Sequence, residues 1–317
     1  MLQPSHATLP IIAAPMFLVS GPEIVIACCK AGIVGTFPAL NQRSSEGFDD
    51  WLTDIERTLS GIQHPGYGVN LIVHKTNPRL QQDLDICVKH KVPLVITSLG
   101  AVKDLVDAVH SYGGKVFHDV TTLRHAQKAA DAGVDGLIAV SAGAGGHAGT
   151  LHPLALLGEI KTFFNGTLIM SGCLSTGADV ASAIAAGADY AYMGTRFICT
   201  DESRAAIAYK TMIENSTAKD IVYTDKVSGV YANFLGASLA AAQNDGANPS
   251  HAEGAPIDFG KELLAPEDGG AKAWKDIWSA GHGVGSISNT LPVKSLVNEL
   301  VNDYQIAIQR AAAAAPK

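Results

Sequence analysis

Eight short strand-like runs alternate with longer, alanine-rich amphipathic segments over the first two hundred residues of the chain. This alternation is typical of strand–helix units repeated around a parallel sheet. The expected strands are Leu9–Ala14, Gly32–Phe37, Tyr67–Asn70, Pro93–Ser98, Lys115–Val120, Gly136–Val140, Thr167–Ser171 and Tyr190–Met193. The expected helices lie near 21–31, 47–60, 78–90, 101–111, 122–132, 153–164 and 175–186.

A short signature recurs where an expected helix leads into an expected strand. It reads Lys30-Ala-Gly-Ile33, Asp131-Ala-Gly-Val-Asp-Gly136 and Ala186-Gly-Ala-Asp189. Glycine just after a helix accepts the left-handed conformation that ends the helix and turns the chain back toward the sheet. Together with eight strands, this signature favours an α/β fold of the closed (β/α)8 type, the TIM barrel. An open doubly wound sheet remains the alternative, because the strand count is inferred from sequence alone.

The strand–helix rhythm ends after Phe197. Helices are expected over 202–215 and 292–311, whereas 220–236 is mixed and 237–271 is rich in Ala, Gly and Asn. We therefore expect residues 1–200 and 279–317 to form the barrel and residues 201–278 to form a helical insertion or lid, a second domain.

Composition limits the class of partner. A net charge of −7 disfavours a general binder of nucleic acid or anionic membrane. No apolar run is long enough to span a bilayer, and the first residues do not resemble a secretory signal. The five cysteines form no Cys-x-x-Cys pair, which favours a reduced, cytoplasmic protein. The expected partner is a small-molecule substrate.

Two segments after late strands suit a phosphate group. Ser171–Gly177 leads from the seventh expected strand into a helix, and Met193–Arg196 leaves the eighth. Loops after strands seven and eight, together with a helix N-terminus, are the usual phosphate grip of such barrels. The alternative is that Gly172 and Gly194 are only tight-turn residues.

A glycine-rich loop, Ser141–Thr150, follows the sixth expected strand and contains four glycines and His147. Its Gly143-x-Gly145-x-x-Ala148 spacing formally matches a dinucleotide-binding fingerprint. We reject that interpretation because the next helix begins only at Pro153, and because no acidic residue ends the next strand. His147 is the only side chain in the loop that could move a proton near neutral pH, so it is a candidate catalytic residue. A structural histidine is the alternative.

Three further polar residues could reach the pocket. His118 and Asp119 end the fifth strand, where an ordinary hydrogen-bonded pair is the alternative, and Ser141 begins the glycine-rich loop. His147 and His152 are five residues apart with no clustered Cys or His ligand set, so no metal site is expected. Cys173 is interpreted as a packing residue.

Several of these motifs, in this order, resemble the nitronate monooxygenase family, formerly called 2-nitropropane dioxygenases. The resemblance spans about residues 9–200 and a late glycine-rich segment. The motifs are Ala13-Ala-Pro-Met16, Gly68-Val-Asn70, Ala144-Gly-Gly-His-Ala-Gly149, Ser171-Gly172, Met193-Gly-Thr-Arg-Phe197 and Ala280-Gly-His-Gly-Val-Gly-Ser-Ile287.

The resemblance implies a barrel with a helical second domain that binds FMN non-covalently. By motif match, Pro15, Met16 and Asn70 would lie near the flavin, and Gly145 and Gly146 would adjoin its ring. Ser171, Gly172, Gly194 and Thr195 would hold the phosphate. His147 matches the family's catalytic histidine, and Gly285 of the late segment is a further pocket candidate.

This chain also departs from the family pattern. Relatives often carry Lys where this chain has Asp119, which puts a cationic contact to the flavin in doubt. Ser171-Gly172 replaces the common Gly-Gly, and His282 stands where Gln is frequent. These changes suggest a divergent subgroup and weaken the transfer of substrate identity more than that of the cofactor.

The resemblance implies oxidation of alkyl nitronates with O2 to a carbonyl compound and nitrite. A positioned imidazole could also take the acidic α-proton of a neutral nitroalkane, provided that its pKa lies near the working pH. Two alternatives remain. One is an NAD(P)H-dependent flavin reductase of quinones or enoyl thioesters, and the other is a flavin-free barrel isomerase or lyase for a phosphorylated substrate. A homodimer is a possible assembly.

Overall fold

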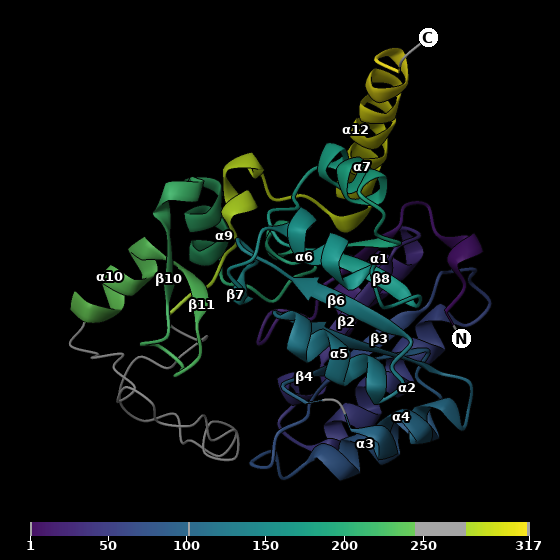
Figure 1. The fold of residues 1–317 in the computed structure, drawn as a ribbon. Coiled ribbons are helices and arrows are strands. Elements are labelled where there is room, and N and C mark those ends of the chain that lie inside the picture. The colour runs from purple at the N-terminus through teal and green to yellow at the C-terminus, as the bar shows by residue number, and fades with distance from the viewer. Residues whose placement is uncertain (1, 101, 245–276, 316–317) are drawn as a thin grey trace.

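The computed structural model describes residues 2–100, 102–244 and 277–315. Eight parallel strands close into a barrel, in which β1 pairs with β9 through Ile12 and Tyr192 (Figure 1). The predicted (β/α)8 barrel is therefore confirmed. Its strands are β1 (Ile11–Ala13), β2 (Val34–Pro38), β3 (Tyr67–Ile72), β4 (Leu94–Ser98), β5 (Lys115–Val120), β6 (Gly136–Val140), β8 (Thr167–Ser171) and β9 (Tyr190–Met193).

Helices follow the strands at the predicted places, and several begin at a side-chain cap. Ser44 and Thr122 each accept a backbone hydrogen bond at a helix start, and Thr176 forms a capping box with Asp179. Such caps satisfy amide groups that lack a partner in the first turn. The helices are α1 (Pro22–Lys30), α2 (Ser45–Leu59), α3 (Leu80–Lys89), α4 (Lys103–His110), α5 (Leu123–Asp131), α6 (Pro153–Ile160), α7 (Gly177–Ala185) and the short α8 (Thr195–Ile198).

The recurring glycine signature works as expected. Gly32, Gly133 and Gly187 each follow a helix and have φ of 82°, 85° and 93°. Only glycine adopts this conformation without strain, so each helix stops and the chain turns into the next strand.

Alternating strand residues divide the buried core in two. One set packs against the helices, for example Val116 and Val120 of β5. The other set points into the barrel, for example Phe117 of β5 and Ile96 of β4. Side chains alternate across a strand, so every second residue continues to point inward. The last inward residues of each strand lie at the carboxyl end of the barrel. There the inward positions become polar, with Asn70, Ser98, Asp119, Ser171 and Tyr192.

The chain after β9 combines helices with an antiparallel sheet. Strand β11 pairs with β10 on one side and with the two-residue β7 (Gly146–His147) on the other. The prediction of a helical insertion therefore fits only part of the described residues of 201–278, and 245–276 lie outside the described residues. The division into domains stays a prediction. The elements are α9 (Ile207–Glu214), η3 (Ala218–Asp220), β10 (Ile221–Thr224), β11 (Ala232–Leu235) and α10 (Gly236–Asn244).

The last helix returns to the barrel. After η4 (His282–Ser286), α12 (Val293–Ala313) buries Val293, Leu296, Val297 and Leu300 and packs beside α7. Its C-terminal half extends away from the barrel (Figure 1). Among the described residues, no helix is both long and apolar enough to cross a membrane.

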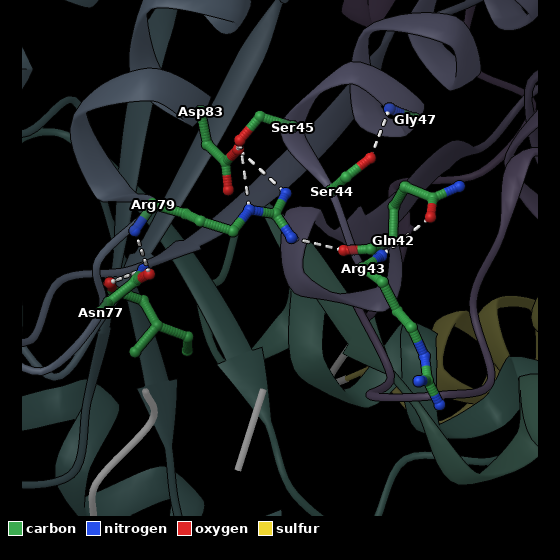
Figure 2. A network of polar contacts seen from close by, with 9 residues as sticks. Gln42, Arg43, Ser44, Ser45, Gly47, Asn77, Arg79 and Asp83 are labelled. Carbon is green, nitrogen blue, oxygen red and sulfur yellow. Dashed lines mark hydrogen bonds and ion pairs between the residues drawn. The ribbon is translucent and has the colours of Figure 1, made fainter. Parts of the chain in front are cut away.

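A buried ion pair joins two loops at the carboxyl end of the barrel. Arg79 donates to Asp83 (3.0 Å), to Ser45 Oγ (3.2 Å) and to the carbonyl of Gln42, and Ser45 donates to Asp83 (2.6 Å) (Figure 2). Burial raises the pKa of Asp83, while Ser45 and Arg79 oppose that rise. Removing one partner of such a pair leaves the other charge uncompensated and destabilises the fold. The pair therefore holds the loops after β2 and β3 in place relative to each other.

Helix α1 approaches β2 at a position that only glycine fits. A Cβ on Gly35 would lie 2.7 Å from the Val25 carbonyl oxygen and 2.8 Å from its Cα. We predict that Gly35→Ala lowers the free energy of unfolding by about 1–3 kcal/mol, because the backbone atoms cannot move aside freely. Denaturant unfolding measures the change.

Gly158→Ala is the matched control. Gly158 lies in α6 with no atom within 4 Å of an added Cβ. That change is expected to raise stability by about 0.5–1 kcal/mol. Equal effects of the two substitutions would contradict the packing of α1 on β2.

Candidate active site at the carboxyl end of the barrel

A cavity of about 1050 Å³ lies at the carboxyl ends of the barrel strands. It brings together residues that the sequence placed at the ends of six separate strands. Of the predicted site residues, the following line it: Pro15, Met16, Asn70, His118, Asp119, Gly145, Gly146, His147, Ser171, Gly172, Gly194 and Thr195. Their assignment to particular ligand atoms stays a prediction.

Two predicted pocket residues do not line the cavity. Ser141 is fully buried, and both its amide and its hydroxyl donate to the carbonyl of Ser171. Gly285 lies near Thr217 and Ala218. The late glycine-rich segment instead contributes Gly281 and Gly283 to the lining. Gly285 lies further along the η4 turn, where the chain has left the cavity.

The floor of the cavity holds a chain of hydrogen bonds across three strands. Asn70 Nδ2 donates to Ser98 Oγ (2.8 Å), and Ser98 Oγ donates to Asp119 Oδ2 (2.6 Å). Burial raises the pKa of Asp119 to about 6, and the Ser98 hydrogen bond opposes that rise. Tyr192 of β9 is buried nearby, and its pKa is raised by burial and by the charge of Asp119.

At one end of the cavity, glycine backbones from separate loops lie in close contact. Gly172 has φ of 124°, and a Cβ there would lie 2.6 Å from Ser141 Oγ and 2.9 Å from the Ala142 carbonyl oxygen. The amides of Gly172 and Cys173 donate to no group among the described residues. Free amides beside a helix start form a cradle for an anion, so this end of the cavity fits a phosphate.

The late glycine-rich segment is anchored on the loop after β9. The Gly281 amide donates to Thr195 Oγ1 (2.9 Å), and the Arg196 guanidinium donates to the carbonyl and side chain of Asn289 (2.9 and 2.8 Å). A Cβ on Gly281 would lie 2.5 Å from the Gly143 carbonyl oxygen. Thr195 Oγ1 is the acceptor in this bond, so its hydroxyl hydrogen can be donated to another acceptor, such as a phosphate oxygen.

His147 is held above the cavity by a sheet that the sequence did not predict. It pairs with Ala232 of β11, and the adjacent Gly146 pairs with Asn233. Asn233 is buried and donates through Nδ2 to the Ala144 carbonyl (2.7 Å). Burial lowers the pKa of His147 to about 4, so the imidazole is neutral in the ligand-free protein at neutral pH.

His118 points away from the barrel interior. Its Nδ1 lies 2.7 Å from Thr97 Oγ1, and burial lowers its pKa to about 4, with a smaller contribution from His125. His118 and Asp119 therefore lie on opposite faces of β5 and form no pair with each other, so the alternative of an ordinary pair is excluded.

Several lining residues were missed by the sequence. Tyr192 was recognised only as part of a strand, and its inward orientation depends on the barrel register. The outer part of the cavity is lined by Tyr223 and Tyr231, whose rings stack 5.0 Å apart, and by His125 and Lys128 of α5. No group of three or more potential metal-ligating side chains occurs in 2–100, 102–244 and 277–315.

The fold and the cavity define a TIM-barrel enzyme whose cavity is lined by glycine backbones and a half-buried histidine. The nitronate monooxygenase family matches residues 72–303. The chain therefore belongs to the nitronate monooxygenase family of flavin-dependent oxidoreductases, and it is an oxidoreductase. This result does not support the flavin-free isomerase or lyase.

Individual relatives agree with this assignment. The chain is 25% identical to a nitronate monooxygenase of Paraburkholderia phytofirmans, over 95% of this chain and 93% of that protein. It is also 25% identical to an octahydroindene-carboxyl-CoA dehydrogenase of Rhodococcus jostii, over 73% of this chain and 63% of that protein. The structure of a nitroalkane oxidase from Streptomyces ansochromogenes shares the fold, with a TM-score of 0.81, 22% identity, and 96% and 99% coverage.

The low pKa of His118 predicts a loss of stability in acid. In the unfolded chain, His118 binds a proton as the pH falls below its ordinary pKa of 6.5. In the folded chain, His118 stays neutral until the pH falls to about 4. The free energy of unfolding should therefore fall as the pH is lowered from 6.5 towards 4. His118→Asn should show a shallower fall in thermal unfolding measured across this range. An equal loss of stability with falling pH in the wild type and in His118→Asn would contradict the lowered pKa of His118.

Proposed function

We propose that this chain is an FMN-dependent nitronate monooxygenase that oxidises alkyl nitronates with O2 to a carbonyl compound and nitrite. The observation that carries the proposal is one cavity that combines a glycine anion cradle, at Gly172, with a half-buried imidazole, at His147. Family membership supports the same chemistry.

The residues present fit FMN. The Gly172 and Cys173 amides and the Thr195 hydroxyl would hold its phosphate, since the two amides donate to no group among the described residues. Asn70 and the Gly145–Gly146 backbone would contact its ring system. When bound, FMN supplies the electron acceptance and the reaction with O2, while the barrel orients the substrate and sets the local electrostatics.

The state of His147 favours a nitronate over a neutral nitroalkane as substrate. A base whose conjugate acid has a pKa of about 4 takes a carbon-bound proton poorly near neutral pH. A nitronate has already lost that proton. Its negative charge beside the imidazole would favour the protonated ring, so His147 would donate a hydrogen bond to the bound anion.

Flavin content tests the proposal. The purified protein should carry FMN, or bind added FMN with a change in flavin absorbance and fluorescence. A protein that contains no flavin and leaves the spectrum of added FMN unchanged would refute the proposed function.

His147→Asn tests the role of the imidazole. We expect kcat/KM for a neutral nitroalkane, already low in the wild type because the imidazole is a weak base, to fall further by roughly 10²-fold, because the remaining proton removal is lost. For the corresponding nitronate we expect a smaller fall, on the order of tenfold, because only a hydrogen bond is lost. Steady-state oxygen consumption with both substrates measures the difference.

His152→Asn is the control for this experiment. His152 lies in the same loop region, does not line the cavity, and caps α6 through a bond from the Leu154 amide that Asn can replace. Its kinetics should match those of the wild type. An unchanged turnover of His147→Asn on both substrates would remove His147 from the mechanism.

Gly172→Ala tests the phosphate cradle. The added methyl group would occupy the space beside Ser141 and Ala142 at a φ that disfavours any side chain, so FMN affinity should fall by roughly tenfold or more. Gly158→Ala is the control, because Gly158 lies in α6 outside the cavity lining and no atom lies within 4 Å of its added Cβ. Fluorescence titration with FMN measures both, and equal affinities would contradict the cradle.

The outer part of the cavity favours one second candidate, an NAD(P)H-dependent flavin reductase. Lys128 offers a cation, and His125 a ring that can form hydrogen bonds. The stacked Tyr223 and Tyr231 offer a flat aromatic surface to a nucleotide. The similarity to a carboxyl-CoA dehydrogenase supports a nucleotide-bearing substrate. Rapid anaerobic bleaching of the flavin by NADH or NADPH, and not by nitronate, would select this candidate.

A further inference from the structure

Asp119 carries a carboxyl group into the interior of the barrel. It follows the inward-facing Phe117 by two residues on β5, so its side chain lies on the same inner side. It lines the cavity together with Asn70 of β3 and Ser98 of β4, which also point into the barrel. The carboxyl group is therefore part of the floor on which a bound ring would rest.

Only one of the two Asp119 oxygens has a partner. Oδ2 accepts the hydrogen bond from Ser98 Oγ, whereas Oδ1 is buried and bonds to no group among the described residues. No lysine, arginine or histidine forms an ion pair with this carboxyl group in the described part of the chain. A buried polar atom without a partner is unfavourable, which indicates that Oδ1 is completed by a ligand.

The proton on this carboxyl group can be placed. Burial raises the pKa of Asp119 to about 6, so the acid form is populated in weakly acidic solution. The Ser98 hydroxyl accepts from Asn70 and donates to Oδ2. The acid proton therefore belongs on Oδ1, the oxygen that has no partner among the described residues.

We propose that Asp119 binds the flavin ring as a carboxylic acid, with Oδ1–H donating to a carbonyl or ring-nitrogen acceptor, and that it thereby tunes the flavin's reduction potential. This inference rests on the proposed FMN function. The hydrogen-bond chain from Asn70 through Ser98 places Asp119 beside an already proposed flavin contact.

A hydrogen bond from Asp119 would make the bound flavin sensitive to pH. A donor at the ring edge stabilises the electron-rich reduced flavin, and an ionised carboxylate at the same place destabilises it. The charge of Asp119 acts on Tyr192 of β9, and His147 lines the same cavity, while Asn70 and Ser98 do not titrate. His118 faces the opposite side of β5, towards His125.

The test compares FMN-loaded wild type, Asp119→Asn and Asp119→Leu by FMN affinity and by midpoint potential from pH 5 to 8. Wild type should show an additional fall in potential as the pH rises through the ionisation of Asp119. Asp119→Asn keeps a donor and should lose that fall. Asp119→Leu should bind FMN roughly tenfold more weakly at pH 5 than wild type, because the donor is gone.

Two controls make the result decisive. Tyr192→Phe removes the neighbouring phenol and should retain the pH profile of the wild type. The isosteric Asp119→Asn variant keeps the test valid if Asp119→Leu does not fold. Identical potential profiles for wild type and Asp119→Asn, with FMN bound to both, would overturn the inference and leave the proposed function standing. Absence of FMN binding by wild type would overturn both.

Discussion

The site depends on the close contact of glycine backbones where loops from different parts of the chain meet. Gly143, Gly172 and Gly281 approach one another's loops so closely that a Cβ at any of them would lie 2.6 Å or less from another atom. This contact joins the ends of β6 and β8 to the late segment that Thr195 and Arg196 anchor. The anion cradle is therefore a consequence of packing, in which amides remain available because the backbone is held in place.

The same loop connects the barrel to the chain beyond it. Gly146 and His147 pair with β11, so the position of the imidazole depends on residues distant in sequence. This pairing buries His147 and keeps it neutral. The floor shows the complementary case, because burial raises the pKa of Asp119 to about 6 and favours its acid form in weakly acidic solution. Two desolvated groups thus face one cavity with shifts that favour their uncharged forms, which suits a planar cofactor and an anionic substrate.

The barrel could be predicted from sequence because its repeats are local. Residue alternation and the helix-ending glycines gave the bounds of β5, β6, β8 and β9 as the structure has them. The cavity residues followed from the rule that strand ends carry function. The run Ile221-Val-Tyr-Thr224 also carried a strand signal in its β-branched and aromatic residues, although the region was expected to be mainly helical.

Other features could not be predicted because they arise only from tertiary contacts. Gly146–His147 has no strand propensity and becomes a strand only by pairing with β11. Ser141 is expected in the pocket because it begins the glycine-rich loop, and Gly285 because the late segment resembles that of the family. The structure directs Ser141 to the Ser171 carbonyl and Gly285 towards η3. The unpartnered oxygen of Asp119 became visible only when the floor of the cavity was assembled.

Anaerobic mixing of the FMN-loaded protein with an alkyl nitronate, followed by O2, tests the central claim most directly. The account predicts that the nitronate changes the flavin absorbance within a single turnover. It also predicts that O2 restores the oxidised spectrum with release of nitrite. A flavin spectrum that the nitronate leaves unchanged, while NADH or NADPH bleaches it, would contradict the account.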